Sequence, residues 1–447
     1  MSVGAPVDTS GMEMPIGARA LPGHARGVSR SVRTRRTVLE LAALSPLLGL
    51  FLIVAQVTDP GPRPVGDEGP LLRAAARILD GHYAMVGSHD ATAFLWHGPG
   101  LPALMAPFLA LHAGIGVIRL LGPALLFAAV VVFHRVLSWR CSPRRALLGA
   151  WALGLYAPAW SVLGSAHKEP LAMLLVVVAM AGTLRYLRGG GKVALATGGL
   201  ALAALAMTRL EFGWAIVALL IVAAAAALLR PGPGYRRLVA VCAVAAVGCV
   251  PWLVYTYGLT GRLLYWGNAG SLSLFWMSAP TPDQLGQWHS WRSTLGQASL
   301  AFYRPLFQRL TPLDPLHRDL ALQHLAWLQA TGHPAKFLVN LGANIARMWA
   351  GLPFSFRLAP AILAALWASN LALLAALGRA ARRTVRFSRA RSAAIRADPA
   401  ARAFAVFAVI GLAVHLLPSS EPRMMLPVVP VLIWLAMHRP QGERAPA

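Results

Sequence analysis

The chain has 447 residues, of which 57% are hydrophobic and only 13% are charged. A soluble domain of ordinary composition carries about 25% charged residues, so this composition excludes a soluble globular protein and indicates a polytopic membrane protein. The formal net charge is +25, but the basic residues fall in short clusters between apolar segments. Because cytoplasmic loops of membrane proteins have this pattern, we predict no nucleic-acid partner.

Residues 1–37 are rich in glycine, proline, serine and arginine, and we predict a disordered basic cytoplasmic tail. The apolar run 38–57 comes next. It is too long for the core of a signal peptide, which has about 7–15 residues, and no small-residue cleavage site follows it. We therefore expect a first membrane-spanning helix that is retained.

An apolar helix of about 20 residues crosses the hydrocarbon core of a bilayer. Segments of about this length recur along the chain and predict an all-α polytopic membrane protein with about ten transmembrane helices, within a membrane domain 38–438. The predicted spans are 38–57, 115–134, 146–163, 170–187, 193–208, 212–229, 238–257, 358–377, 402–417 and 424–438. One further apolar run, 101–111, has about 11 residues, which favours a helix at the membrane surface.

The basic clusters decide the topology. If the run 101–111 crossed the membrane, the arginine cluster 135–145 would lie outside and every later loop would invert, against the positive-inside rule. With this run on the surface, the basic loop 378–401, the tail 439–447 and both termini are cytoplasmic. The preference for arginine over lysine indicates a GC-rich bacterial genome, so we expect the bacterial inner membrane.

The outer side then receives two long loops, 58–114 and 258–357. In the first, Leu71, Ala75 and Ile78 share one helical face, which predicts a helix that lies in the membrane plane with its apolar side toward lipid. This helix and the run 101–111 are the two predicted interfacial helices. The second loop is rich in tryptophan, which favours an interfacial belt, and we see no separate soluble domain of ordinary composition in it.

Three motifs in the first outer loop belong together. Asp67-Glu68 follows the first span, a helix ends at Asp80-Gly81, and residues 96–102 read Trp-His-Gly-Pro-Gly-Leu-Pro. They resemble the first loop of C-type membrane glycosyltransferases, and most of all the family-39 group of protein O-mannosyltransferases and bacterial aminoarabinose transferases. Residues 326–349 and the motif Glu421-Pro422-Arg423 agree with this resemblance. The sequence departs from it at Gly98, where many members have proline.

The resemblance implies a C-type glycosyltransferase fold and an inverting enzyme. Such an enzyme takes a sugar from a polyprenyl-phosphate donor and passes it to a lipid, glycan or protein acceptor on the outer face. A hydroxyl acceptor needs a base to take its proton, and Asp67 matches the proposed base of the family. The alternative is that Asp67 caps the helix that follows it.

Two further carboxylates are candidates for catalysis. Glu68 would orient the acceptor, or raise the pKa of Asp67 through like-charge proximity. The alternative is a solvated loop carboxylate. Glu169 lies at the outer end between two predicted spans, where the family often has an acidic residue. Its alternative is a first-turn position that complements the helix dipole.

The leaving phosphate requires positive charge at the outer interface. Four basic residues lie at outer ends of predicted spans: His97, Lys168, Arg209 and Arg423. Three of them have a simpler alternative. Arg209 either binds phosphate or pairs with Glu211, and Arg423 either binds phosphate or pairs with Glu421. His97 is either a phosphate ligand or an interfacial packing residue.

The same outer residues leave a metal site open as an alternative. A divalent cation could be held if four side chains converge: Asp67, Glu68, Glu169 and His97. Lys168 and Arg209 make a metal unnecessary for phosphate, so we predict no metal and no other cofactor. The three cysteines have no metal-ligand spacing.

Two other functions fit parts of the sequence. A transporter or flippase for a lipid-linked glycan places charges near the bilayer midplane and shows inverted repeats, neither of which we find. A glycan polymerase or ligase shares the lipid-phosphate leaving group, and the sequence separates it poorly from a glycosyltransferase. Membrane lipids and the polyprenyl-phosphate sugar are the expected partners.

Overall fold

The computed structural model describes residues 25–84, 94–352, 360–386, 398–418 and 420–438. Contacts divide the chain into two units, Met1–Ala43 and Leu44–Ala447, and the site described below lies in the second. The described residues form helices and connecting loops, with no strand among them. Helix α1 (Ala25–Val57) begins inside the segment 1–37, where the sequence predicts disorder. Residues 1–24 and the tail 439–447 lie outside the described residues, as does the middle of the basic loop 378–401.

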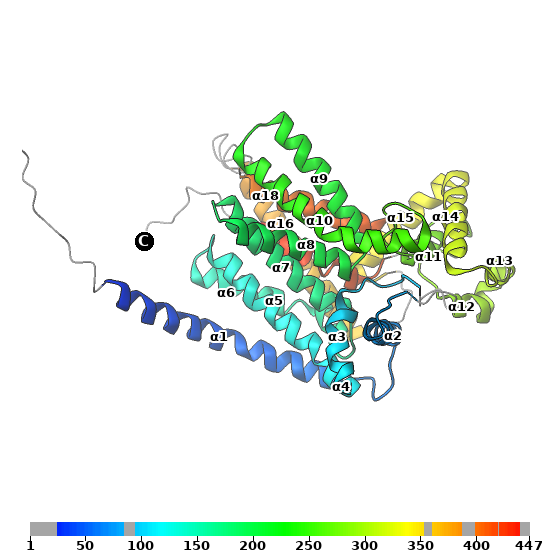
Figure 1. Ribbon diagram of the computed structural model, residues 1–447, viewed down its shortest axis with the longest axis horizontal. Helices are drawn as coiled ribbons and strands as arrows, with labels where there is room; N and C mark the ends of the chain where they lie inside the picture. The colour runs from blue at the N-terminus through cyan, green and yellow to red at the C-terminus, as the bar shows by residue number, and fades with distance from the viewer. Residues whose placement is uncertain (1–24, 85–93, 353–359, 387–397, 419, 439–447) are drawn as a thin grey trace, which may run out of the picture. The chain divides into compact units, whose positions relative to one another are not determined.

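The remaining helices follow in chain order (Figure 1). In the first half they are α2 (Glu68–Leu79), α3 (Gly100–Ala110), α4 (Ile115–Arg119), α5 (Leu121–Ser138), α6 (Pro143–Gly154), η2 (Ala157–Val162), α7 (Lys168–Leu187), α8 (Lys192–Thr208), α9 (Glu211–Leu229) and α10 (Pro233–Thr260). In the second half they are α11 (Ala269–Met277), α12 (Trp291–Gly296), η3 (Ala298–Tyr303), α13 (Arg304–Leu310), α14 (Pro315–Gly332), α15 (Pro334–Ala350), α16 (Pro360–Arg386), α18 (Pro399–Leu416), η4 (Pro422–Met425) and α19 (Val429–Met437).

Among the described residues, seven segments are long and apolar enough to cross a membrane, so the protein is an all-α polytopic membrane protein. They are Val38–Val57, Ile115–Ser138, Lys168–Leu187, Glu211–Leu229, Pro233–Thr260, Pro360–Arg382 and Pro399–Leu416. The other three predicted spans are helical but shorter or broken. α8 has 17 residues, the segment 146–163 divides into α6 and η2, and the last span divides into η4 and α19. Pro158 is the second residue of η2, and Pro427 lies between η4 and α19. Proline favours a break at such positions because it lacks the N–H that a continuous helix needs.

Small residues let the central helices α7, α8 and α10 pack closely, and Figure 1 shows them side by side. A Cβ added at Gly182 of α7 would lie 2.2 Å from the backbone nitrogen of Gly198 in α8. One added at Gly199 would lie 2.5 Å from Val244 of α10. Such close contact between backbones is how membrane helices associate where no hydrophobic driving force is available. It holds α7 and α8 against each other, and the site is built at their opposite ends, where α7 begins and α8 ends.

Both short helices predicted in the first outer loop are present as α2 and α3. The apolar face of α2 differs from the prediction, because it packs on α3 rather than facing lipid. Leu71 and Ala75 are fully buried with Leu101 and Met105 of α3. The loop thus has a small core of its own, which holds the start of α2 in place.

The long outer loop also contains a core, which the sequence did not predict. Trp276 is completely buried and its ring lies 5.7 Å from that of Phe307 and 4.9 Å from that of Tyr303. The guanidinium of Arg318 lies 4.9 Å from the ring centre of Trp291. Many aromatic residues of this loop therefore form the interior of a helical subdomain, and Trp327 is one of the exceptions at 68% exposed.

Candidate active site

The segment that carries His97 is held between the end of α8 and the chain that follows α10. Leu95 N donates to Asn268 Oδ1 (3.2 Å), and Asn268 N donates to Leu95 O (3.3 Å). On the other side, a Cβ added at Gly98 would lie 2.0 Å from the carbonyl oxygen of Met207. No side chain fits at this position, which explains why proline is absent from the motif here.

His97 is buried and joined to Lys168. Because an ammonium group can only donate, His97 Nδ1 accepts from Lys168 Nζ (3.1 Å), and the ring proton is on Nε2. Nε2 has no hydrogen-bond partner among the described residues. Burial, helped by the charge of Lys168, lowers the pKa of His97 to about 3, so the ring is neutral at physiological pH. The hydroxyl of Tyr83 donates to the His97 carbonyl (2.7 Å) and fixes the backbone.

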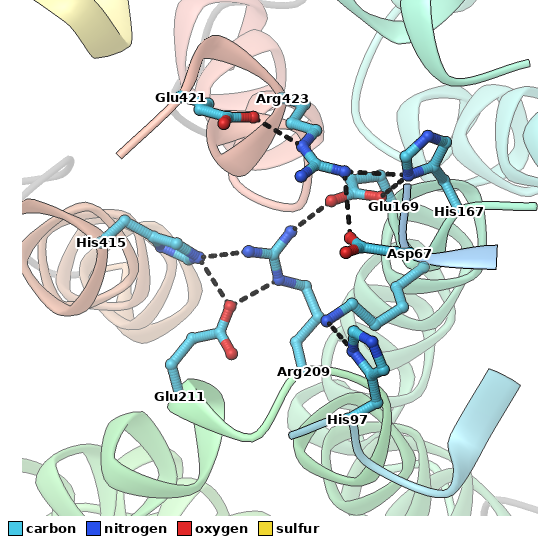
Figure 2. Close-up of polar contacts among 10 residues, drawn as sticks. Asp67, His97, His167, Glu169, Arg209, Glu211, His415, Glu421 and Arg423 are labelled. Atoms are coloured by element: carbon cyan, nitrogen blue, oxygen red, sulfur yellow. Dashed lines mark hydrogen bonds and ion pairs between the residues drawn. The ribbon is translucent and has the colours of Figure 1, made fainter. Parts of the chain in front are cut away.

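Asp67 meets Arg423, which lies far away in the sequence (Figure 2). Arg423 Nη1 donates to Asp67 Oδ2 (3.3 Å) and to His167 Nδ1 (2.9 Å), while Nε donates to Glu421 Oε2 (2.9 Å). Asp67 occupies the N-cap position of α2, but its side chain makes no capping hydrogen bond. The carboxylate is therefore directed to the charge cluster, and 30% of the side chain is exposed.

The charge of Arg423 sets the protonation state of Asp67. Burial by itself raises the pKa of this carboxyl, but Arg423 and Lys168 hold the pKa well below its usual range. Asp67 is therefore ionised throughout the physiological pH range.

Glu68 lies apart from this cluster, in a site of its own. Both of its oxygens accept from Arg119, at 2.9 Å from Nε and 2.8 Å from Nη2, and they also accept from the backbone nitrogens of Ala166 (2.6 Å) and Val65 (3.0 Å). Burial raises the pKa of Glu68, but the hydrogen bonds from Arg119 outweigh it and lower the pKa. The predicted catalytic role does not fit, because Glu68 is fully buried and its oxygens are occupied.

Arg209 also differs from its prediction as a phosphate ligand. Its Nε donates to Glu211 Oε1 (2.6 Å), its Nη1 donates to Glu169 Oε1 (3.0 Å), and its Nη2 lies 3.3 Å from His415 Nε2 (Figure 2). The side chain is only 4% exposed. The structure therefore shows the alternative, an ion pair with Glu211. Glu169 and His415 contact the other two nitrogens of the guanidinium.

Glu169 is held inside the same cluster. Its side chain is 3% exposed, and His167 Nδ1 lies 3.7 Å from its Oε2. A carboxylate that substrate cannot reach does not act as a base on it. The geometry therefore does not fit the predicted catalytic role for Glu169, and makes it the partner that positions Arg209.

Two cations of the cluster keep hydrogen-bond donors that no described residue uses. Lys168 Nζ bonds only to His97, and Arg423 Nη2 makes no hydrogen bond to a described residue. Both side chains are partly exposed. A phosphate that approaches Asp67 would thus find an ammonium and a guanidinium with free N–H groups, as the predictions for Lys168 and Arg423 require.

Seven site residues were predicted, and six of them converge. Asp67, His97, Lys168, Glu169, Arg209 and Arg423 belong to one cluster at the ends of α7 and α8, with only Glu68 outside it. His167 and His415 also belong to the cluster, and neither was predicted as a site residue. His415 is a polar residue inside an apolar span, and that alone marks it as unusual. His167 gave no such signal.

The metal alternative required Glu68 to join the other three ligands, and Glu68 is bound to Arg119 instead. Within the described ranges, no group of three or more His, Cys, Asp or Glu side chains is arranged to hold a metal ion. The choice between a metal and basic residues alone stays a prediction.

This fold is that of the C-type membrane glycosyltransferases. The chain is similar to the archaeal oligosaccharyltransferase AglB from Archaeoglobus fulgidus, solved with an inhibitory peptide and a dolichol-phosphate, with a TM-score of 0.50 and 12% identity over 89% of this chain and 50% of AglB. The apo oligosaccharyltransferase of that organism gives the same values. The chain therefore spans half the length of these relatives.

ArnT from Cupriavidus metallidurans, solved with undecaprenyl phosphate, has a TM-score of 0.38 and 15% identity over 88% of this chain and 77% of ArnT. No model of a known protein family and no curated protein sequence matches the chain. At these identities the likeness to AglB concerns the fold.

We expect Gly98→Ala to disturb the site, because the new Cβ would overlap the Met207 carbonyl. Overpacking of this kind costs about 1–3 kcal/mol in folding free energy. Thermal unfolding of the purified protein in detergent measures the loss. Gly114→Ala is the matched control, because nothing lies within 4 Å of its added Cβ. Equal stability of the two variants would show that the loop does not press against α8.

We expect Glu68→Gln to destabilise the protein by about 3–5 kcal/mol, because it leaves Arg119 buried without its main counter-charge. Asp59→Asn removes the other carboxylate on Arg119, but this one is 33% exposed and should cost about 1 kcal/mol or less. Denaturant unfolding of both variants tests the difference. A Glu68 variant as stable as the Asp59 variant would contradict the structural role of Glu68.

Proposed function

We propose that this protein is an inverting glycosyltransferase that moves a sugar from a polyprenyl-phosphate donor to a lipid, glycan or protein acceptor. The observation that supports this most directly is one partly exposed carboxylate, Asp67, held beside Lys168 and Arg423, whose free donors suit a phosphate. A base and an anion site next to each other are what glycosyl transfer from a lipid phosphate needs. The fold shared with AglB, whose complex includes a dolichol-phosphate, agrees with a lipid-phosphate donor.

The reaction follows from these positions. Asp67 takes the proton of the acceptor hydroxyl while the hydroxyl oxygen forms a bond to the anomeric carbon of the sugar. The bond between that carbon and the phosphate oxygen breaks, and the electron pair leaves with the polyprenyl phosphate. Lys168 and Arg423 stabilise the negative charge that develops on the leaving oxygen. Because the acceptor attacks from the face opposite the leaving group, the anomeric configuration inverts.

The side of the membrane follows from the helix directions. The cluster lies at the N-terminal end of α7 and the C-terminal end of α8, while Arg185, Arg188 and Lys192 lie at the opposite ends. Under the positive-inside rule, those arginines and the lysine are cytoplasmic, so the reaction would take place on the outer face. We propose the bacterial inner membrane as the location, with both termini in the cytoplasm.

The position of the charges also favours an enzyme over a transporter. Transporters place substrate sites near the middle of the bilayer, where helices are broken. Here the ionised groups gather at one end of the long helices, next to Glu169 and Arg209. A site at the membrane surface suits an acceptor that arrives from the aqueous side.

Asp67→Asn tests the proposal. We expect transfer from a labelled polyprenyl-phosphate sugar to fall by about 10²–10⁴-fold, because the acceptor loses its base. Asp80→Asn removes an exposed carboxylate at the other end of α2 and is the matched control. The assay uses membranes that contain the full chain. Unchanged transfer by the Asp67 variant would exclude the proposed base, and wild-type protein that binds no lipid phosphate would exclude the whole class of function.

Arg423→Gln should change how activity depends on pH. In the native protein Arg423 holds the pKa of Asp67 low, so protonation of Asp67 does not limit the rate near neutral pH. Without Arg423 burial dominates and the pKa of Asp67 rises, so the acid limb of kcat/KM moves to higher pH. Arg63→Gln, at an exposed loop arginine, should leave the limb where it is. An acid limb that stays in place in the Arg423 variant would contradict this coupling.

A further inference from the structure

We propose that Glu211, and not Glu169, is the second carboxylate that contacts substrate, and that it accepts hydrogen bonds from hydroxyl or ammonium groups of the donor sugar. This inference rests on the proposed function. It assigns the part of the site that would distinguish one donor sugar from another.

The first argument is access. The Glu211 side chain is 29% exposed, close to the 30% of Asp67, whereas Glu169 is 3% exposed. Glu211 is the first residue of α9, at the same end of the bundle as the other charged groups. Of the carboxylates that pair with Arg209, only Glu211 reaches the surface of the cluster.

The second argument is the way Glu211 is held. Its Oε1 accepts from Arg209 Nε (2.6 Å) and lies 3.2 Å from His415 Nε2, while Oε2 has no hydrogen bond to a described residue (Figure 2). Asp67 has the same arrangement, with Oδ2 bound to Arg423 and Oδ1 unbound. A carboxylate with one fixed oxygen and one free oxygen is already oriented for a ligand, so little entropy is lost on binding.

The third argument is the position of Lys168. The charges of Asp67, Glu211 and Glu169 all act on its ammonium group, and of these three carboxylates only Asp67 and Glu211 are partly exposed. A phosphate bound to Lys168 would therefore lie near two partly exposed carboxylates. If Asp67 serves the acceptor, Glu211 is the carboxylate left for the sugar that the phosphate carries.

The charge of the cluster limits which sugars fit. It contains four carboxylates, Asp67, Glu169, Glu211 and Glu421, and three cations, Lys168, Arg209 and Arg423. With histidines counted as neutral, the formal charge is +3 − 4 = −1, and the phosphodiester of the donor adds another negative charge. A sugar carboxylate next to Glu211 would be repelled. The site therefore suits a neutral or amino sugar and disfavours a uronic acid.

Binding to the full chain in lipid nanodiscs tests this assignment. The ligands are polyprenyl phosphate without sugar, and the same lipid with a neutral hexose, an aminopentose or a hexuronic acid. The measured quantity is the ratio of affinities for sugar-bearing and sugar-free lipid. Glu211→Gln keeps an oxygen for Arg209 and His415 but replaces the free carboxylate oxygen with an amide. Asp80→Asn is the control for loss of a surface carboxylate.

We expect wild type to favour the hexose or aminopentose lipid over the hexuronate lipid. For the favoured sugar, Glu211→Gln should lower the affinity ratio by about tenfold. Its affinity for sugar-free lipid should not fall, which also shows that the variant is folded. A larger loss for the aminopentose than for the hexose would identify an ammonium as the group that Glu211 binds.

Two results would overturn the assignment while leaving the proposed function intact. One is an unchanged ratio in Glu211→Gln, and the other is an equal loss for lipid with and without sugar. Wild-type protein that binds neither form of lipid would overturn the proposed function and this inference together.

Discussion

The buried ion pairs of Arg209 hold together the helix ends that carry the site. A guanidinium that is 4% exposed is costly in an apolar protein unless carboxylates neutralise it and accept its N–H groups. Glu169 and Glu211 do so, and they come from the first turns of α7 and α9. Three helix ends are thus fixed by one side chain, and removing both carboxylates would leave its charge buried without a partner. The charged residues of the site are brought together because the buried guanidinium needs carboxylates as hydrogen-bond acceptors.

The cluster therefore has an inner and an outer part with different roles. The inner part consists of Arg209 and Glu169, which are buried and form an ion pair with each other. The outer part consists of four partly exposed residues, each of which is held by hydrogen bonds and keeps a donor or acceptor that no described residue uses: Asp67, Lys168, Glu211 and Arg423. Groups held in this way bind a ligand without first having to be ordered, and the inner pairs supply the rigidity.

Hydrophobic length predicted the long helices, and the topology placed Asp67, Lys168 and Arg423 on the same side of the membrane as parts of one predicted site. Neither could show which carboxylates would be buried. Glu68 and Asp67 are neighbours in the sequence, but Glu68 is bound by Arg119, which lies inside the predicted span 115–134, and nothing local indicates that its partner is in the first loop. Burial depends on contacts between distant segments, and these leave no local pattern.

The close contact of Gly98 with the backbone of α8 influences the protonation state of His97. Because Gly98 rests on the carbonyl of Met207, the His97 ring is held in the interior, where burial keeps it neutral. A neutral ring can accept from the Lys168 ammonium, whereas a protonated ring would repel it. His97 thus orients Lys168 without adding charge of its own. A substitution that pushed the loop outward would expose the ring and favour its protonation, so this one backbone contact also helps to fix where the cation for the phosphate lies.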